Sequence, residues 1–333
     1  MLTALNRRVA VSSVSVVAVL LFLVLWHNYE FQPSFLPKQL SEYDDASAAN
    51  STLGFQAILA LSQGTKWRVD GIKAASSISG ITVTIPNQPG WSEDFIKAFE
   101  AFGPVEAHGA AMAWLGHLDL LKFIIQNGWG SALIMEDDVD WDVDVRQQTR
   151  QISRAVKKLT KSRSPAPYGD DWDVLWMGHC SDPPYHDQRD GPMVIFDDNT
   201  TIPLEKYQGL DPHIREVVKE GQRSVHYSRN PVCTFAYAVT ARGARRLLAH
   251  AAKGKGGAFD LMLMHACQDK ILKCVSVNPE VFDPYNPAEG SSSEVRAGDD
   301  GSVFNVEVGK AKGQTNNILH SARCNALFGE DCL

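Results

Sequence analysis

The sequence predicts an α/β protein in which a mostly parallel sheet is flanked by helices and preceded by one transmembrane helix. Short apolar runs that suit buried strands alternate with segments of helical periodicity, as in sheets with helical crossovers. One run, from Ser131 to Met135, ends directly in carboxylates that begin at Glu136. The expected strands cover residues 53–61, 81–85, 131–135, 172–178, 232–240 and 273–277, and the expected helices cover 65–75, 91–102, 109–127, 144–161, 243–252 and 259–266.

The N-terminal part is expected to lie outside the folded body. Val9 to Trp26 is almost wholly apolar and follows two arginines, which favours a single membrane-spanning signal anchor with its basic flank in the cytosol. A cleaved signal peptide is the competing interpretation, but no small-x-small cleavage site directly follows the apolar run. The predicted organisation is a cytosolic tail at 1–8, a transmembrane signal anchor at 9–26, a stem at 27–52 and one folded domain at 53–333.

Composition limits the partners and the compartment. The 333 residues carry a formal net charge of −7 with a pI near 5.8, which argues against a nucleic-acid partner. The even number of cysteines suits disulfides in an oxidising lumen, and no Cys-x-x-Cys spacing indicates a zinc site. Acceptor tripeptides for N-glycosylation begin at Asn50 and Asn199, in agreement with a lumenal body.

The acidic stretch after the strand at 131–135 is the strongest candidate site. A solvated loop is the ordinary interpretation of an acidic run, but these acids follow a core strand, where α/β proteins bind ligands. A calcium-binding loop starting at Asp138 is excluded, because its sixth position is Val143 instead of Gly and its twelfth is Thr149 instead of Glu. We therefore expect one or two carboxylates to hold a hard divalent cation that also binds a diphosphate.

Four further residues are binding candidates, each with a structural alternative. His117 lies at the edge of the apolar stripe of its helix, where substrate contact and a satisfied core histidine are both open interpretations. Arg68 follows the first strand and could pair with a phosphate, although a surface salt bridge is the simpler interpretation. Gly178 and His179 end a predicted buried strand and are donor-pocket candidates by position alone.

Several motifs are specific in combination. They are Gly116-His117-Leu118, Ala132 to Asp138, Asp173 to Cys180, and Phe235 to Leu248. Together they resemble glycosyltransferase family 25, which contains bacterial lipooligosaccharide galactosyltransferases and collagen galactosyltransferases, and the likeness is greatest to fungal members with one N-terminal anchor. The resemblance covers residues 53 to 285. The family often has Ser-His where this chain has Gly116-His117, so a hydroxyl is missing there.

The resemblance implies a GT-A fold, a Rossmann-like sheet with the donor site at the carboxyl ends of its strands. It also implies a nucleotide-sugar donor, most often UDP-galactose, a divalent ion, usually Mn²⁺, and inverting transfer of a hexose to a glycan or glycoprotein. Glu136-Asp137-Asp138 would be the counterpart of the family's Asp-x-Asp motif. The resulting candidates are Asp138 and Asp260 for catalysis, Glu136, Asp138 and Asp140 for the metal, and Arg68, His117, Asp137, Gly178 and His179 for the donor.

Other interpretations stay open beside this one. Asp260 is the candidate base for the acceptor hydroxyl, although a helix N-cap is an equally natural role for it. A lumenal glycan-binding protein without turnover is the main alternative function, and a metal-dependent phosphoesterase would want more histidines near the acids. The expected location is the Golgi or ER membrane, in single-pass type II orientation.

Overall fold

The computed structural model describes residues 48–102, 108–180, 182–184, 191–209, 214–254, 257–288 and 311–333. The chain divides into two units, Met1–Ser41 and Glu42–Leu333, and the described residues all belong to the second. The predicted cytosolic tail, the membrane anchor and most of the stem lie outside the described residues. In the part of the chain that is described, no helix combines the length and apolarity needed to cross a bilayer.

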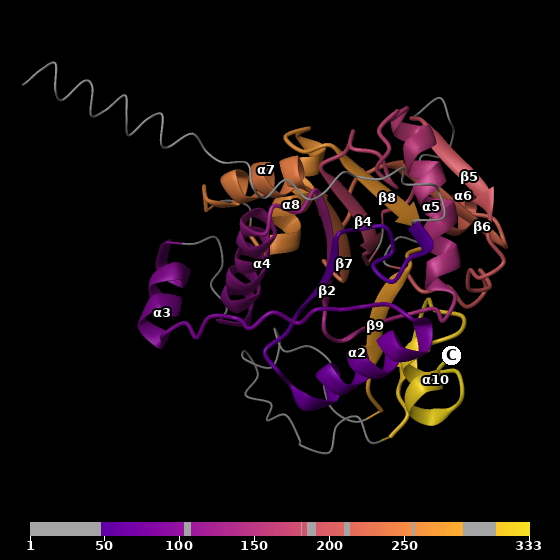
Figure 1. The fold of residues 1–333 in the computed structure, drawn as a ribbon, viewed down its shortest axis with the longest axis horizontal. Helices are drawn as coiled ribbons and strands as arrows, with labels where there is room; N and C mark the ends of the chain where they lie inside the picture. Colours follow the sequence, from indigo (N-terminus) through magenta and orange to yellow (C-terminus); the bar gives the residue numbers. More distant parts are fainter. Residues whose placement is uncertain are drawn as a thin grey trace, which may run out of the picture. The chain divides into compact units, whose positions relative to one another are not determined.

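A seven-stranded mixed sheet forms the centre of the fold (Figure 1), with the strand order β1-β2-β7-β4-β8-β6-β5. The strands are β1 (Ala57–Leu61), β2 (Ser131–Glu136), β4 (Val174–Gly178), β5 (Met193–Asp197), β6 (Gln222–Tyr227), β7 (Ala236–Thr240) and β8 (Cys274–Asn278). In this sheet β1/β2 and β4/β8 are parallel pairs, and the other neighbouring pairs are antiparallel. The prediction of a mostly parallel sheet is therefore wrong, because β7 and β6 are inserted in the opposite direction between forward strands.

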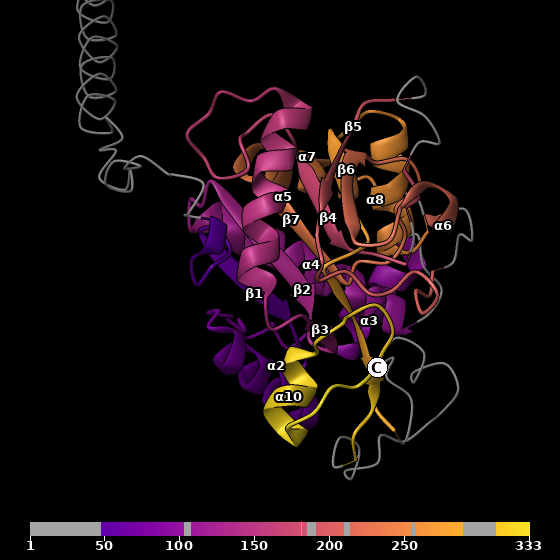
Figure 2. The same cartoon turned by 90° about the vertical axis from the view of Figure 1, so that its right-hand side faces the viewer.

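The forward strands β1, β2, β4 and β8 nevertheless end at one edge of the sheet, where β7 and β6 begin. A small antiparallel sheet lies beyond this edge, with the order β10-β9-β3. Its strands are β3 (Val139–Trp141), β9 (Phe282–Asn286) and β10 (Gln314–Thr315). Figure 2 shows the small sheet at the same end of the molecule as α2 and α10.

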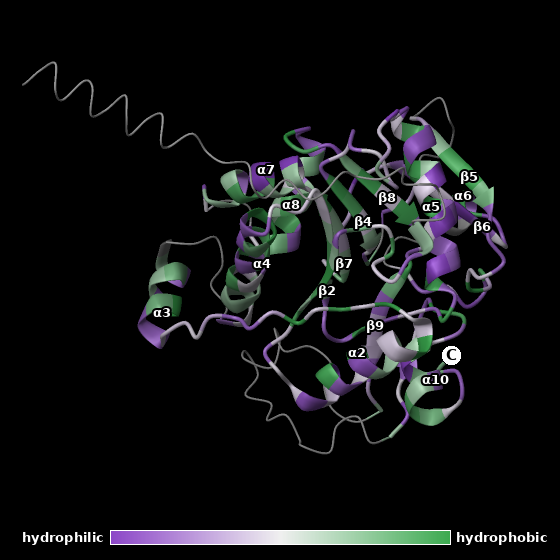
Figure 3. Ribbon diagram, viewed as in Figure 1, coloured by the Kyte–Doolittle hydropathy of each residue, from purple (hydrophilic) through white to green (hydrophobic). Residues whose placement is uncertain are grey.

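Helices cover both faces of the central sheet. They are α2 (Lys66–Ser79), α3 (Glu93–Phe102), α4 (His108–Gln126), α5 (Val145–Thr160), α6 (Ile214–Val217), α7 (Ala241–Ala251), α8 (Phe259–Gln268) and α10 (Ala322–Phe328). Successive strand residues point to opposite faces, so Ala132 and Ile134 pack with α4, α7 and α8, whereas Leu133 and Met135 pack with α2 and α5. Figure 3 shows the resulting apolar strands between helices with hydrophilic outer faces.

Parts of the predicted element list differ from the structure. Residues 81–85 contribute one parallel bridge, from Thr84 to Leu59, instead of a strand. The insertion at 181–230, predicted without regular structure, contains β5, α6 and β6. Ala48 belongs to the predicted stem but is fully buried, and its carbonyl accepts a hydrogen bond from Thr149 at 2.8 Å. The folded body therefore begins before residue 53.

The structure also decides the cysteine pairing, which the sequence left open. The disulfides are Cys180–Cys233, Cys267–Cys274 and Cys324–Cys332, so all six cysteines are paired. The first joins the end of β4 to the segment before β7, the second joins α8 to β8, and the third closes the C-terminal segment around α10.

Candidate active site

The acidic turn lies where the forward strands of the central sheet end. β2 ends at Glu136, Asp137 and Asp138 form a turn, and β3 begins at Val139. The apolar residues of β2 are fully buried between β1 and β7. The core therefore fixes the position of the turn, and the predicted junction of a buried strand with carboxylates is confirmed.

Glu136 is partly buried at the last position of β2. Its Oε1 accepts a hydrogen bond at 3.0 Å from the hydroxyl of Thr234, on the segment that leads into β7. Burial, followed by repulsion from Asp138, raises the pKa of Glu136 to about 8. A bound cation would reverse this effect, because a nearby positive charge stabilises the carboxylate.

The other two acids of the turn face a buried arginine. Arg68, on α2, is 4% exposed, and its Nη1 lies 2.6 Å from Oδ1 of Asp137. Its Nη2 lies 3.1 Å from Oδ2 of Asp138. Arg68 thus forms a buried ion pair with both acids, which corrects the expectation of a surface salt bridge. The observed contacts of Arg68 hold the side chains of the acidic turn in place. A direct bond between Arg68 and a phosphate of the donor stays a prediction.

A second buried arginine contacts the turn. Arg323, on α10, is 1% exposed, and its Nη2 donates to the carbonyl oxygen of Asp137 at 3.0 Å. Its guanidinium lies over the rings of Trp67 and Tyr285, at 5.8 and 5.1 Å from their centroids. Burial lowers the pKa of Arg323, against the attraction of the nearby acids. Space for the guanidinium exists because residue 71 is Gly, where a Cβ would lie 2.3 Å from Nη1.

Asp140, predicted to bind the metal, is fully buried against α10. Its Oδ1 accepts hydrogen bonds from the backbone N–H groups of Trp141 at 2.8 Å and Arg323 at 2.9 Å. Its Oδ2 accepts a hydrogen bond from the hydroxyl of Ser321. Asp140 therefore attaches α10 to the small sheet, and both of its carboxylate oxygens are used by donors of the protein. The assignment of Asp140 to the metal is therefore corrected to a structural role.

His117 is buried beneath Glu136 and does not reach the surface. Its ring stacks on Phe259 at 4.3 Å, and burial lowers its pKa to about 3, so it is neutral. Its Nδ1 lies 3.1 Å from the hydroxyl of Tyr237 and its Nε2 lies 3.4 Å from Oγ1 of Thr234. Since the Thr234 hydroxyl donates to Glu136, it accepts from His117. His117 is thus a core histidine and does not contact a donor directly. Its role is to orient Thr234, the hydrogen-bond partner of Glu136.

Asp260 holds the loop that precedes β7. Its Oδ2 accepts a hydrogen bond from the backbone N–H of Cys233 at 3.0 Å, and its Oδ1 accepts one from Leu261 at 2.9 Å. Cys233 has a φ of 65°, in the left-handed region that non-glycine residues rarely adopt, and its disulfide fixes it further. The N-cap of α8 is Ala258, so the N-cap alternative for Asp260 is wrong. Asp260 positions the residue next to Thr234, and its role as a base stays a prediction.

Gly178 and His179, predicted to line the donor pocket, are covered by β9 and β8. A Cβ at Gly178 would lie 2.7 Å from the carbonyl oxygen of Phe282, so Gly is needed for close packing between strands. His179 is fully buried, and its Nε2 lies 3.0 Å from the carbonyl oxygen of Val277. Both assignments are corrected to packing roles, because neither residue presents a surface to a ligand.

A divalent cation fits the turn by charge and by donor chemistry. Four acids, Glu136, Asp137, Asp138 and Asp140, lie near two arginines, Arg68 and Arg323. Glu136, with its pKa of about 8, would ionise at neutral pH only when a cation binds. Carboxylate oxygens are the ligands that hard divalent cations prefer. Within the described ranges, no three His, Cys, Asp or Glu side chains are grouped as a metal-binding set. Metal binding by Glu136 and Asp138 therefore stays a prediction that rests on their charge and donor chemistry.

Thr234 and Arg323 are the residues that sequence reasoning missed. Thr234 lies within the predicted strand at 232–240, a position that gave no chemical signal. Arg323 lies 186 positions after Asp137, in a segment that was not assigned to any element. The Gly at position 71, between the apolar residues of α2, was the one local sign that another group approaches this helix.

Comparisons with known proteins add no named relative. No family model matches the chain, and no curated protein sequence matches it, so the resemblance to family 25 rests on the motifs quoted above. Among solved structures, the chain is similar to the crystal structure of A197 from STIV, with 9% sequence identity and a TM-score of 0.30. That match covers 69% of this chain and 85% of A197.

Proposed function

We propose that this chain is a metal-dependent glycosyltransferase that transfers a hexose, with galactose as the first candidate, from a UDP-sugar to a glycan or glycoprotein acceptor with inversion. The observation that carries the proposal is the turn Glu136-Asp137-Asp138. It extends beyond a buried strand at the sheet edge where α/β proteins bind ligands, with more carboxylates than arginines around it. A divalent cation held by Glu136 and Asp138, Mn²⁺ in the first instance, would neutralise the charge that develops on the leaving UDP.

The surrounding residues keep this turn in one arrangement. Arg68 fixes the side chain of Asp137 and also pairs with Asp138, while Arg323 fixes the backbone of the turn. Thr234 orients Glu136 and is itself oriented by the neutral ring of His117. Such supporting hydrogen bonds normally decide how well carboxylates bind a metal.

The proposed location is the lumen of the Golgi or ER, on a single-pass type II anchor. The pairing of all six cysteines supports an oxidising compartment, because cytosolic thiols are kept reduced. Asn199, an acceptor for N-glycosylation, is exposed in a turn after β5, as a lumenal glycan site requires.

The test is release of UDP by the purified full chain in a mild detergent. A panel of UDP-sugars is supplied with and without Mn²⁺, for the wild type, Asp138→Asn and the matched control Asp119→Asn. Asp119 lies on α4 and pairs with Lys122 at 2.9 Å, away from the turn. We expect Mn²⁺-dependent release from one UDP-sugar, a loss of at least about 100-fold in Asp138→Asn, and no change in Asp119→Asn.

Two results would contradict the proposal. Binding of a UDP-sugar without release, even with a broad set of acceptors, would favour the glycan-binding alternative. Release that Asp138→Asn leaves intact would mean that the turn does not carry the chemistry. Product stereochemistry, read from the anomeric proton coupling in the NMR spectrum, tests inversion separately.

A further inference from the structure

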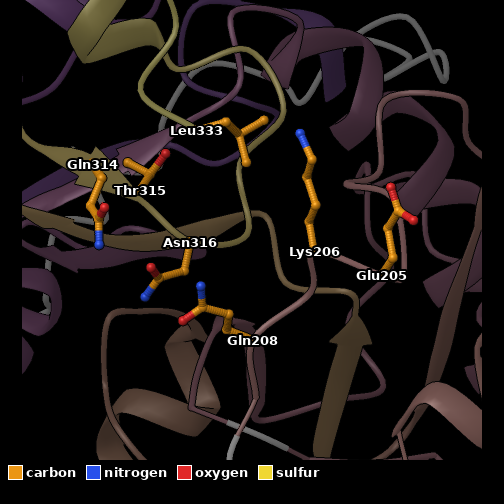
Figure 4. A pocket seen from close by; sticks show the side chains of 7 residues that line it. All are labelled: Glu205, Lys206, Gln208, Gln314, Thr315, Asn316 and Leu333. Carbon is orange, nitrogen blue, oxygen red and sulfur yellow. The ribbon is translucent and has the colours of Figure 1, made fainter.

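A pocket of 390 Å³ lies between the insertion and the C-terminal segment (Figure 4). Gln314, Thr315 and Asn316 line one side of it, and Lys206 lies on the other, with Gln208 at its base in this view. Amide and hydroxyl groups dominate this lining. The side chains of Lys206 and its neighbour Glu205 carry charges of opposite sign. Leu333, which is 48% exposed, adds an apolar contact.

The pocket is built on a fixed frame. The side chain of Asn317 accepts a hydrogen bond from the backbone N–H of Gln208 at 2.8 Å and donates to its carbonyl oxygen at 2.6 Å. The hydroxyl of Tyr207 donates to buried Glu280 at 2.8 Å. These bonds use the backbone of Gln208 and leave its side-chain amide to the pocket. The two walls are thus joined before any ligand arrives, which lowers the entropy cost of binding.

Thr315 provides the observation that points to a ligand. Its side chain is 3% exposed and lines the pocket, and its Oγ1 has no hydrogen-bond partner among the described residues. A buried hydroxyl without a partner is costly, typically by about 1–3 kcal/mol. Because less than 1 Å² of this oxygen is accessible, a ligand hydroxyl would become its partner only with a small movement of the pocket wall.

The pocket lies close to the acidic turn along the small sheet. Thr315 pairs with Tyr285 of β9, and the backbone N–H of Tyr285 donates to the carbonyl oxygen of Asp138 at 2.8 Å. Two strand spacings therefore separate the backbones of Thr315 and Asp138, a distance of about 10 Å. The pocket and the acidic turn thus flank the same strand, β9.

We propose that this pocket is a subsite for an uncharged saccharide unit of the acceptor glycan. Amide side chains donate and accept hydrogen bonds at once, which matches the paired hydroxyls of a sugar ring, and Leu333 offers a surface to the apolar face of the ring. That the bound saccharide is part of the acceptor rests on the proposed function, whereas the preference for a saccharide rests on the lining of the pocket.

The test measures saccharide binding and turnover separately. Neutral di- and trisaccharides of glucose, galactose and mannose are titrated into the full chain in a calorimeter, for the wild type and for Gln208→Ala, Asn316→Ala and Thr315→Val. Gln126→Ala, an exposed glutamine at the end of α4, is the matched control. We expect the pocket variants to weaken binding of the preferred saccharide about tenfold, with the control unchanged. Hydrolysis of the UDP-sugar without acceptor should be equal in all of them.

The outcomes separate this inference from the proposed function. Saccharide binding that the pocket variants weaken, in a chain that turns over no UDP-sugar, would support the subsite and refute the transferase. Turnover that needs Asp138, with saccharide affinity and acceptor KM unchanged in the pocket variants, would refute the subsite alone. Absence of binding for every saccharide in the panel would also overturn it.

Discussion

Replacing Asp140 separates the structural acids of the turn from the proposed functional ones. In Asp140→Ala, the N–H groups of Trp141 and Arg323 lose the carboxylate acceptor, and the hydroxyl of Ser321 keeps only a 3.8 Å contact to Sγ of Cys332. Each buried donor left without a partner costs about 1–3 kcal/mol. The attraction between Asp140 and the buried guanidinium of Arg323 is lost as well. These costs overlap, so we expect a loss of about 3–5 kcal/mol, a large part of the stability of an ordinary domain.

Asp140→Asn should cost less than Asp140→Ala. Burial raises the pKa of Asp140 despite Arg323 and the hydrogen bonds, so the folded protein disfavours the charged form relative to the unfolded chain, and a neutral amide loses little by comparison. Asn keeps one oxygen as an acceptor. The matched change Asp138→Asn should also cost less than Asp140→Ala, because Asn keeps one oxygen beside Arg68 and Arg68 keeps Asp137 as a charged partner.

Urea-induced unfolding followed by tryptophan fluorescence measures these differences, since Trp141 is adjacent to Asp140. The free energy of unfolding is compared among variants whose dependence on urea concentration is unchanged. The reasoning fails if Asp140→Ala is within about 1 kcal/mol of the wild type, or if Asp138→Asn is destabilised as strongly.

Other predictions follow from single contacts. The pKa of His117 is about 3 in the folded protein against 6.5 for a free histidine. Between these pH values the unfolded chain binds one more proton than the folded protein, so the free energy of unfolding falls by about 1.4 kcal/mol for each pH unit of acidification. His117→Phe should lack this part of the pH dependence, and equal slopes for the two proteins in acid unfolding would contradict the reasoning. Gly243→Ala would place a Cβ 2.0 Å from a backbone carbonyl oxygen just before β4 and should lower the free energy of urea unfolding by about 1–3 kcal/mol or more, whereas Gly90→Ala, with open space around it, should not. Thr234→Val removes the hydroxyl that holds Glu136 and should raise the Mn²⁺ concentration for half-maximal UDP release by about 10-fold or more. It should also lower the free energy of unfolding by about 1–3 kcal/mol, because His117 loses its acceptor. Equal Mn²⁺ curves would exclude this supporting role.

The sequence predicted much of the local structure. The apolar run before Glu136 identified β2, and the spacing of apolar residues identified α4, α5 and α7, because each pattern reports its own burial. β6 was missed because its buried side chains include Arg223 and His226, which a hydropathy pattern assigns to the surface. Their burial depends on partners elsewhere, such as Asp198, which lies 2.6 Å from Arg223.

The candidate site was predicted in place but not in detail. The run Glu136-Asp137-Asp138 placed the acids at a strand end, since several adjacent charged residues are rarely buried together. Whether each carboxylate faces a ligand or a protein partner depends on residues distant in the chain. Arg68 pairs with Asp137, whereas Ser321 and the backbone N–H of Arg323 donate hydrogen bonds to Asp140. No local sequence pattern around these acids indicates which partner each one has.

By itself, the sequence determined the α/β class, the acidic end of β2 and the apolar stripes of the main helices. These features follow from the spacing of apolar residues along the chain, which shows which side of a strand or helix is buried. Tertiary structure alone decided that β7 and β6 run against their neighbours, that Gly178 and His179 are covered, and that Gln208 and Thr315 share a pocket. Strand order and contacts between remote side chains arise from how all the elements pack at once. That collective choice is not encoded in any single stretch of residues.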